Sequence, residues 1–249
     1  MSHSEETILA DDTVIERVEQ RANERLRVYL NVMWEGVLGR DKGTISDISQ
    51  GGCFILSGAK VIPQELIRVE IQLPTDEWIT TWGEVANYTE EIGFGIRYTE
   101  FDEGQGKYDD LIQCVRLIQF ATAALRHLDT STVKRDCDTP IELLITAQDY
   151  RTLLMMTFAK VNKALLSLPE CTRKANLRSS LEAYMDACRA WEAALKDGVE
   201  GHKLRIKMHK RLQERYNAPR EALSALVRRE PYPVLNFLWN EGAFYLTRA

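Results

Sequence analysis

The sequence lacks the segments that take a protein out of the cytosol or across a membrane. It begins with MSHSEETILADD, an acidic and polar stretch without the features of a secretory signal. No uninterrupted apolar run approaches the roughly 20 residues of a membrane span. We therefore expect a cytosolic protein without membrane insertion.

The usual catalytic and metal-binding patterns are also absent from the sequence. Its five cysteines are an odd number with no Cys-x-x-Cys pair, which argues against a disulfide framework and a zinc ribbon. Its four histidines form no His-Glu-x-x-His pattern, and there is neither a Walker A loop nor a Gly-x-Ser-x-Gly elbow. We expect no enzyme, no metal site and no cofactor.

Basic residues are slightly fewer than acidic ones, which gives a formal net charge of -5. This balance argues against a nucleic-acid partner. The stretch 201–216 is nevertheless basic, and we interpret it as the solvated face of a helix. A docking surface for an acidic partner is the second interpretation, and nucleic acid is the third.

What the sequence has is the composition of a packed protein and two different periodicities. It has 249 residues, of which 45% are hydrophobic and 28% charged, close to the globular average. From about residue 25 to 100, apolar residues alternate with polar ones in short runs between turn residues. The runs are RLRVYLNVMW, GTISDIS, GCFILS, LIRVEIQLP, WITTWGEVANY and IGFGIRYTE. Six such strands with no intervening helix predict an antiparallel barrel or sandwich over 15–104.

After residue 104 the apolar residues follow a helical period. Three seams have spacings of three and four residues: Leu111, Cys114, Ile118, Ala121, Leu125 and Leu128; Ala147, Tyr150, Leu154, Thr157, Val161, Leu165 and Leu168; Leu177, Leu181, Tyr184, Cys188, Trp191 and Leu195. We expect a linking helix over 105–128 and a helical bundle over 129–249, with a disordered acidic segment over 1–14. The predicted fold class is α+β with segregated domains.

The seams and the tail leave two interpretations open. The seams indicate packing within one bundle, and pairing with a second copy in a homo-oligomer is the alternative. The apolar and aromatic tail 231–246 either packs on its own bundle or forms a patch for a protein partner.

Two short motifs indicate a ligand site. In Asp47-Ile48-Ser49 both polar side chains leave a strand on the same side, and adjacent glycines follow. The preceding segment carries Arg21 and Arg25, whose guanidinium groups suit the O6 and N7 acceptors of guanine. Asp47 suits the opposite, hydrogen-donating edge of guanine, and Ser49 suits a phosphate oxygen. These groups fit a small anionic guanine nucleotide.

In these motifs the sequence resembles the PilZ domain family. Arg21-x-x-x-Arg25 and Asp47-x-Ser49-x-x-Gly52 occur in the family's order and at its usual spacing. The resemblance covers about residues 15–125 and implies a six-stranded antiparallel β-barrel that binds cyclic di-GMP. It implies that Arg21 and Arg25 grip guanine and phosphate, that Asp47 and Ser49 hold the other guanine edge and nearby polar groups, and that Gly52 permits close approach.

Three further residues are secondary candidates for the same site. Arg17 opens a second Arg-x-x-x-Arg register with Arg21, and Gly51 adjoins Gly52. Gln20 directly precedes the first motif arginine. In the family, residues just before that arginine decide whether one ligand or a stacked pair of ligands binds.

The resulting prediction is a cyclic di-GMP receptor that relays binding to a helical output or oligomerisation domain. In this hypothesis the ligand orders the segment before Arg25. The family resemblance suggests motility or exopolysaccharide control, with a protein target that the sequence does not name. The alternative is a scaffold whose bundle carries the function and whose barrel is structural.

Overall fold

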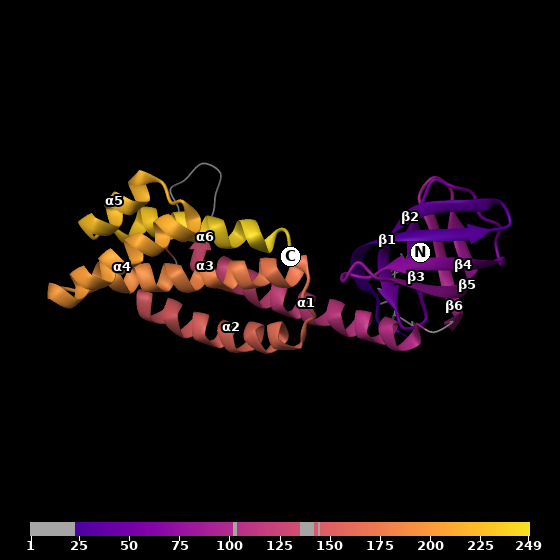
Figure 1. The fold of residues 1–249 in the computed structure, drawn as a ribbon, viewed down its shortest axis with the longest axis horizontal. Helices are drawn as coiled ribbons and strands as arrows, with labels where there is room; N and C mark the ends of the chain where they lie inside the picture. Colours follow the sequence, from indigo (N-terminus) through magenta and orange to yellow (C-terminus); the bar gives the residue numbers. More distant parts are fainter. Residues whose placement is uncertain (1–22, 102–103, 135–141, 144) are drawn as a thin grey trace, which may run out of the picture.

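A computed structural model describes residues 23–101, 104–134, 142–143 and 145–249. It has a β-barrel at one end and a bundle of helices at the other (Figure 1). This arrangement confirms the predicted fold class. The predicted disordered segment 1–14 lies outside the described residues.

The barrel is closed and antiparallel, with the strand order β1-β2-β3-β6-β5-β4. The strands are β1 (Leu26–Gly36), β2 (Gly39–Ser49), β3 (Gly52–Leu56), β4 (Leu66–Gln72), β5 (Trp78–Thr89) and β6 (Gly93–Phe101). In β1, Val28 and Val32 are buried while Arg27 and Asn31 are exposed. The sequence alternation therefore separates a lumen-facing row from an outer row, as the prediction required.

Two register shifts in the barrel fall at the same place in β2, between Ile45 and Asp47. One interrupts the pairing of β1 with β2 between Arg27 and Leu30, and the other interrupts the pairing of β2 with β3 between Ile45 and Asp47. Such irregularities bend and twist a strand locally and re-aim its side chains. Ile48 is buried, whereas Asp47 and Ser49 are partly exposed on the outer side.

In the part of the chain that the structure describes, six α-helices follow the barrel. They are α1 (Gln105–Thr132), α2 (Ala147–Ser167), α3 (Thr172–Leu195), α4 (Gly198–Tyr216), α5 (Arg220–Arg228) and α6 (Pro231–Leu246). A two-stranded sheet of β7 (Val133–Lys134) and β8 (Glu142–Leu143), which the sequence did not predict, lies between α1 and α2. No helix in the described part of the chain is long and apolar enough to cross a bilayer.

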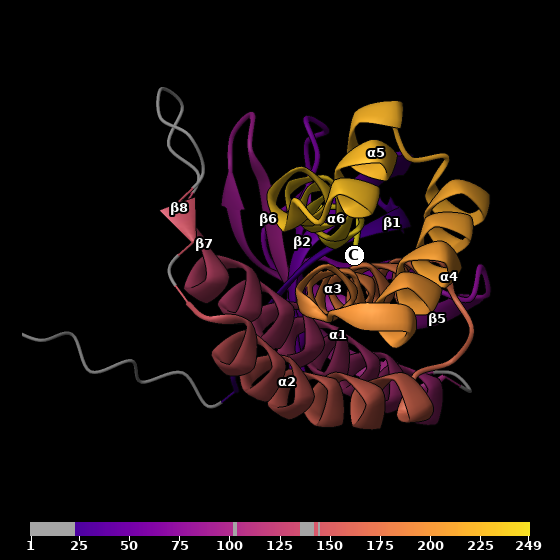
Figure 2. The same cartoon turned by 90° about the vertical axis from the view of Figure 1, so that its left-hand side faces the viewer.

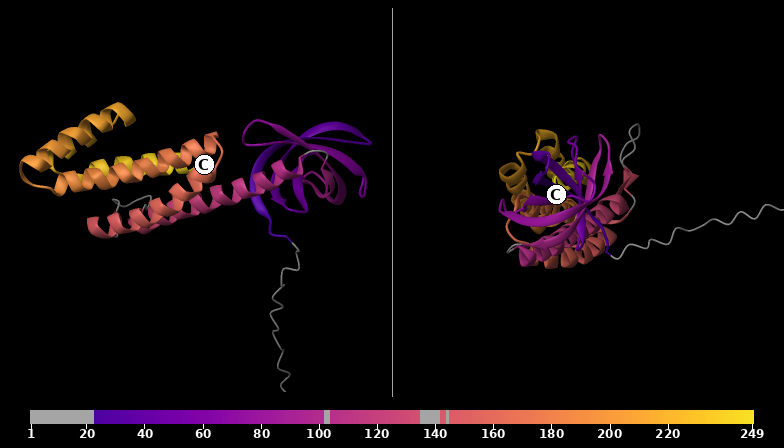
Figure 3. Two further views of the ribbon diagram at one scale, coloured as in Figure 1. Left: turned by 60° about the horizontal axis from the view of Figure 1, so that its bottom comes forward. Right: turned by 90° about the vertical axis from the view of Figure 1, so that its right-hand side faces the viewer.

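Helix α1 belongs to both halves of the molecule. Near its start, Tyr108, Ile112 and Val115 pack into the barrel core. Further along, Ile118 and Leu125 pack into the bundle core. Figure 3 shows this helix running without interruption from the barrel into the bundle. One rigid element therefore connects the two cores.

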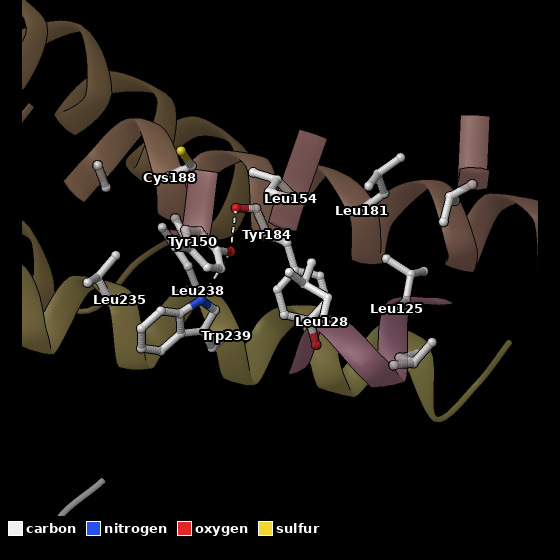
Figure 4. Packing of buried hydrophobic residues seen from close by; sticks show 14 of the residues in the cluster. Leu125, Leu128, Tyr150, Leu154, Leu181, Tyr184, Cys188, Leu235, Leu238 and Trp239 are labelled. Atoms are coloured by element: carbon white, nitrogen blue, oxygen red, sulfur yellow. Dashed lines mark hydrogen bonds between the residues drawn. The ribbon is translucent and has the colours of Figure 1, made fainter. Parts of the chain in front are cut away.

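The bundle core is centred on α1, α2, α3 and α6 (Figure 2). Its aromatic centre also contains polar contacts between helices (Figure 4). The Tyr150 hydroxyl donates to the Tyr184 carbonyl oxygen at 2.8 Å and accepts from Trp239 Nε1 at 3.2 Å. The Tyr184 hydroxyl donates to Asp129 Oδ1 at 2.9 Å. These bonds join all four helices and satisfy polar atoms that burial would otherwise penalise.

The apolar seams and the aromatic tail mostly face this core. The tail 231–246 forms α6 and buries Leu235, Leu238 and Trp239, so it packs on its own bundle. Leu195 is an exception to the third seam, because it ends α3 and is 56% exposed. The expectation that it lies in the core was wrong.

Candidate functional site

The two sequence motifs meet at a shallow depression on the outside of the barrel. Arg25 precedes β1, Ser49 ends β2 and Gly52 begins β3. All three line a cavity of about 240 Å³, together with residues of β5 and β6. This volume is below the range of about 300–1,000 Å³ of drug-sized ligand pockets. The depression is thus an open surface that a larger ligand would cover.

Arg25 and Asp47 form an ion pair at this surface. Arg25 Nη1 lies 3.1 Å from Asp47 Oδ1, and the two side chains are 46% and 22% exposed. The other carboxylate oxygen, Asp47 Oδ2, accepts a hydrogen bond from the Ser46 hydroxyl at 3.3 Å. An exposed pair of this kind contributes about 0–1 kcal/mol to stability. Breaking it in favour of a ligand therefore costs little.

Ser49 and Gly52 have structural partners of their own. The Ser49 hydroxyl donates to the Gly52 carbonyl oxygen at 3.2 Å, which closes the turn between β2 and β3. A Cβ on Gly52 would overlap the carbonyl oxygen of Ile96 in β6. A Cβ on Gly51 would meet the Asn23 side chain alone, at 3.1 Å. The close approach that requires glycine at 52 is therefore that of a neighbouring strand.

The depression contains two polar residues that sequence reasoning missed. Asn23 lies two residues before Arg25, and Arg97 comes from β6, where it pairs in register with Gly52. Arg97 is exposed, so it adds a second guanidinium to the outer surface beside Arg25. Its position in an alternating strand indicated an outward direction, but its neighbours depend on the pairing of β3 with β6.

Three of the sequence candidates lie outside the described residues. They are Arg17, Gln20 and Arg21, which precede Asn23. The described part of the site therefore comprises Arg25, Asp47, Ser49, Gly51 and Gly52.

Helix α1 contacts the same motif segments from the other side. The Tyr108 hydroxyl donates to the Ser49 carbonyl oxygen at 2.7 Å. Gln119 Nε2 donates to the Arg27 carbonyl oxygen at 2.9 Å. Arg116 pairs with Glu24 at 3.3 Å, although both side chains are substantially exposed. Residues next to both motifs are thus bonded to the helix that enters the bundle.

Beneath the motif turn lies a small group of buried ionisable side chains. Burial raises the pKa of Cys53 to about 12 and raises the pKa values of Tyr98 and Tyr108 above their usual range. All three groups therefore stay protonated at neutral pH, and the thiol is not a nucleophile. Within the described ranges, no three His, Cys, Asp or Glu side chains gather as a metal site.

A comparison with protein families decides what this barrel is. The sequence profile of the PilZ domain family matches residues 19–117, which include the barrel strands and the first part of α1. Residues 19–117 form a PilZ domain. PilZ domains are receptors for cyclic di-GMP and are not catalytic. The motif-based resemblance is thereby confirmed for this part of the chain.

Solved structures similar to parts of the chain include the following two. The first is the Bacillus subtilis inhibitor of motility MotI/DgrA, with 21% identity and a TM-score of 0.35, over 41% of this chain and 52% of that one. This chain thus covers about half the length of that protein. The second is the PilZ domain of CeSA from a cellulose-synthesizing bacterium, with 18% identity and a TM-score of 0.31, over 39% of this chain and 98% of that one. None of the curated proteins matches the chain.

Proposed function

We propose that this protein is a cyclic di-GMP receptor whose ligand covers the depression beside Arg25 and Asp47. The observation that carries the proposal is the meeting of the two motifs. Arg25 and Asp47 are 22 positions apart in sequence and 3.1 Å apart in space, inside a PilZ domain. Both side chains remain accessible to a ligand.

Each group has a defined chemical role in the proposed complex. The Arg25 guanidinium donates to guanine O6 and N7 or to a phosphate oxygen, and Arg21 supplies the second fork of the motif. The Asp47 carboxylate accepts from the N1–H and amine of guanine, which no arginine can do. Ser49 gives up its bond to the Gly52 carbonyl and donates to a phosphate oxygen. Arg97 adds a further cation for a ligand with two phosphates.

The proposed relay runs through α1. Ligand binding replaces the Arg25–Asp47 pair and reorganises the residues on either side, Glu24 and Arg27, which are bonded to Arg116 and Gln119 of α1. The same helix holds the Ser49 carbonyl through Tyr108. Because α1 continues into the bundle core, a change in these bonds alters how the helix is held relative to the barrel.

The wider role of the protein belongs to the same proposal. The bundle acts as an output or oligomerisation domain, in the cytosol, without catalysis, and towards a protein target in motility or exopolysaccharide control. Nucleic acid has no part in it. The second candidate is a scaffold in which the bundle carries the function and the barrel is structural. The scaffold is favoured by the contacts of Ser49 and Gly52, because Ser49 bonds to the Gly52 carbonyl and Gly52 lies against the carbonyl oxygen of Ile96.

Calorimetric titration of the full chain with cyclic di-GMP, and with GTP for comparison, tests the binding proposal. We expect selective binding that weakens at least 100-fold when Arg21 and Arg25 are both replaced by alanine. Arg126→Ala is the matched control, because Arg126 is an exposed arginine of α1 outside the depression. Wild-type affinity in the double variant, or no binding in the wild type, would shift the weight to the scaffold.

Hydrogen exchange with and without cyclic di-GMP tests the relay separately. We expect ligand-dependent protection over residues 12–27 and a change in the first half of α1. If the calorimeter reports binding but exchange in both regions stays the same at saturation, the ligand assignment stands and the relay is wrong.

A further inference from the structure

The bundle has an open groove between α2 and α3, far from the motif residues in sequence. Its volume is about 460 Å³, and α4 also lines it, through Arg211. Phe158 and Leu166 come from α2 and Met185 from α3, which gives the groove an apolar lining. Leu166 is 79% exposed, and Met155, on the same side of α2, is also exposed. Methionine and leucine side chains exposed along a groove are typical of surfaces that bind partner helices.

One end of this groove has more positive than negative charge. Asp186 is fully buried and receives Arg189 Nη1 at 2.6 Å and Arg211 Nε at 2.8 Å. Both arginine side chains line the groove and are partly exposed. Two guanidinium groups thus share one carboxylate, which leaves one net positive charge at the groove wall.

The other end repeats the arrangement. Lys174 Nζ lies 2.8 Å and Arg178 Nη2 lies 3.7 Å from the same carboxylate oxygen of Glu170. The remaining acid that lines the groove, Glu182, pairs with Arg215 outside it. A second net positive charge therefore remains beside Arg178.

The spacing of these charges defines the length of a complementary ligand. Arg178 and Arg189 are 11 residues apart on α3 (189 minus 178), which corresponds to about 16 Å along a helix. A bound helix of about three turns has that length. Acidic side chains at both of its ends would meet the two positive charges, and its apolar face would cover Phe158, Leu166 and Met185.

We propose that the α2–α3 groove docks an acidic amphipathic helix of a partner protein. The proposal concerns the bundle alone and does not depend on ligand binding by the barrel. A second copy of this chain is a poorer occupant in charge, because the exposed side of α2 carries Lys160 and Lys163. Placing that side of α2 in a groove with positive ends would bring like charges together.

Two fluorescein-labelled synthetic peptides of 20 residues test the proposal by fluorescence anisotropy with the full chain. Both have leucines at helical spacing; one has glutamates and the other lysines at the flanking positions. We expect the glutamate peptide to bind at least tenfold more tightly than the lysine peptide, with a difference that shrinks in high salt. Arg178→Glu and Leu166→Ser should each weaken the glutamate peptide at least tenfold.

Matched controls separate the groove from general surface effects. Lys210→Glu reverses an exposed charge on α4, and Leu195→Ser removes an exposed leucine of α3, both outside the groove. These variants should bind like the wild type. Equal affinity for the two peptides, no binding, or equal loss in the controls would overturn the proposal. A light-scattering mass of two chains that Leu166→Ser returns to one would also overturn it, in favour of a second copy.

Discussion

The hydrogen bond from Tyr108 to Ser49 gives a direct measure of how firmly α1 is fixed to the ligand-binding face. Tyr108→Phe removes a single oxygen and keeps the ring, which packs against Tyr98 and Phe101 at centroid distances of 5.1 and 5.0 Å. No substantial cavity forms. The loss is therefore that of a bond of 2.7 Å, with the Ser49 carbonyl left without its donor.

The expected magnitude is that of one partly buried hydrogen bond. Losing such a bond costs about 0.5–1.5 kcal/mol. For a protein of this size that loss lowers the melting temperature by about 1–6 °C. In hydrogen exchange, the amides of residues 105–115 should lose protection before those of α3. Urea denaturation and exchange on the Tyr108→Phe variant provide both measurements.

The control for this variant is Tyr29→Phe, because Tyr29 is exposed on β1 and lacks a comparable bond among the described contacts. It should change the free energy of unfolding by less than about 0.5 kcal/mol. If Tyr108→Phe were equally neutral, the bond would contribute nothing to holding α1 against the barrel. The relay would then have to depend on Arg116 and Gln119.

Three other predictions concern stability around the site and the groove. Asp186→Asn should destabilise the protein by roughly 2–4 kcal/mol in urea denaturation, because it removes the carboxylate that holds Arg189 and Arg211, and leave cyclic di-GMP titrations unchanged. Gly52→Ala should cost about 1–3 kcal/mol through overlap with β6, whereas Gly51→Ala should be nearly neutral; equal effects would refute this reading of the two glycines. Burial raises the pKa of the Cys53 thiol from 9.0 to about 12 in the folded protein. The stabilisation from keeping this thiol protonated should therefore be fully present below pH 9 and be lost as the pH rises towards 12, by up to about 1.4 kcal/mol per pH unit. Cys53→Ala should reduce that slope in urea titrations at pH 8, 9 and 10, and an unchanged slope would contradict the assignment.

The six barrel strands could be predicted from the sequence because the pattern that identifies each strand lies within that strand and its flanking turns. Alternation such as that of Val28 and Val32 with Arg27 and Asn31 is local, and the turn residues between strands are equally local. That Arg25 and Asp47 lie at one site could be predicted for a different reason. Their two motifs have the order and spacing of a known family.

The rest of the site depends on contacts between distant segments. Arg97 reaches the depression because β6 pairs with β3, which alternation along one strand does not reveal. The structural requirement for Gly52 has the same origin, since its neighbour is the Ile96 carbonyl. Local spacing also could not separate the two cores along α1. It assigned Leu111 and Cys114 to one seam, whereas Leu111 packs in the barrel and Cys114 in the bundle.

A continuous α1 makes the protein a lever. At 28 residues the helix is about 42 Å long. Its first turns pack into the barrel core and its later turns into the bundle core. Rotation of the helix about its own axis is blocked at both ends, because it would turn buried side chains out of both cores at once. A tilt is not blocked in this way, and a tilt of about 5° at the barrel displaces the far end by about 3.7 Å over this length. Small rearrangements around Arg25 and Ser49 can thus become ångström-scale movements of the bundle without any helix bending or unfolding.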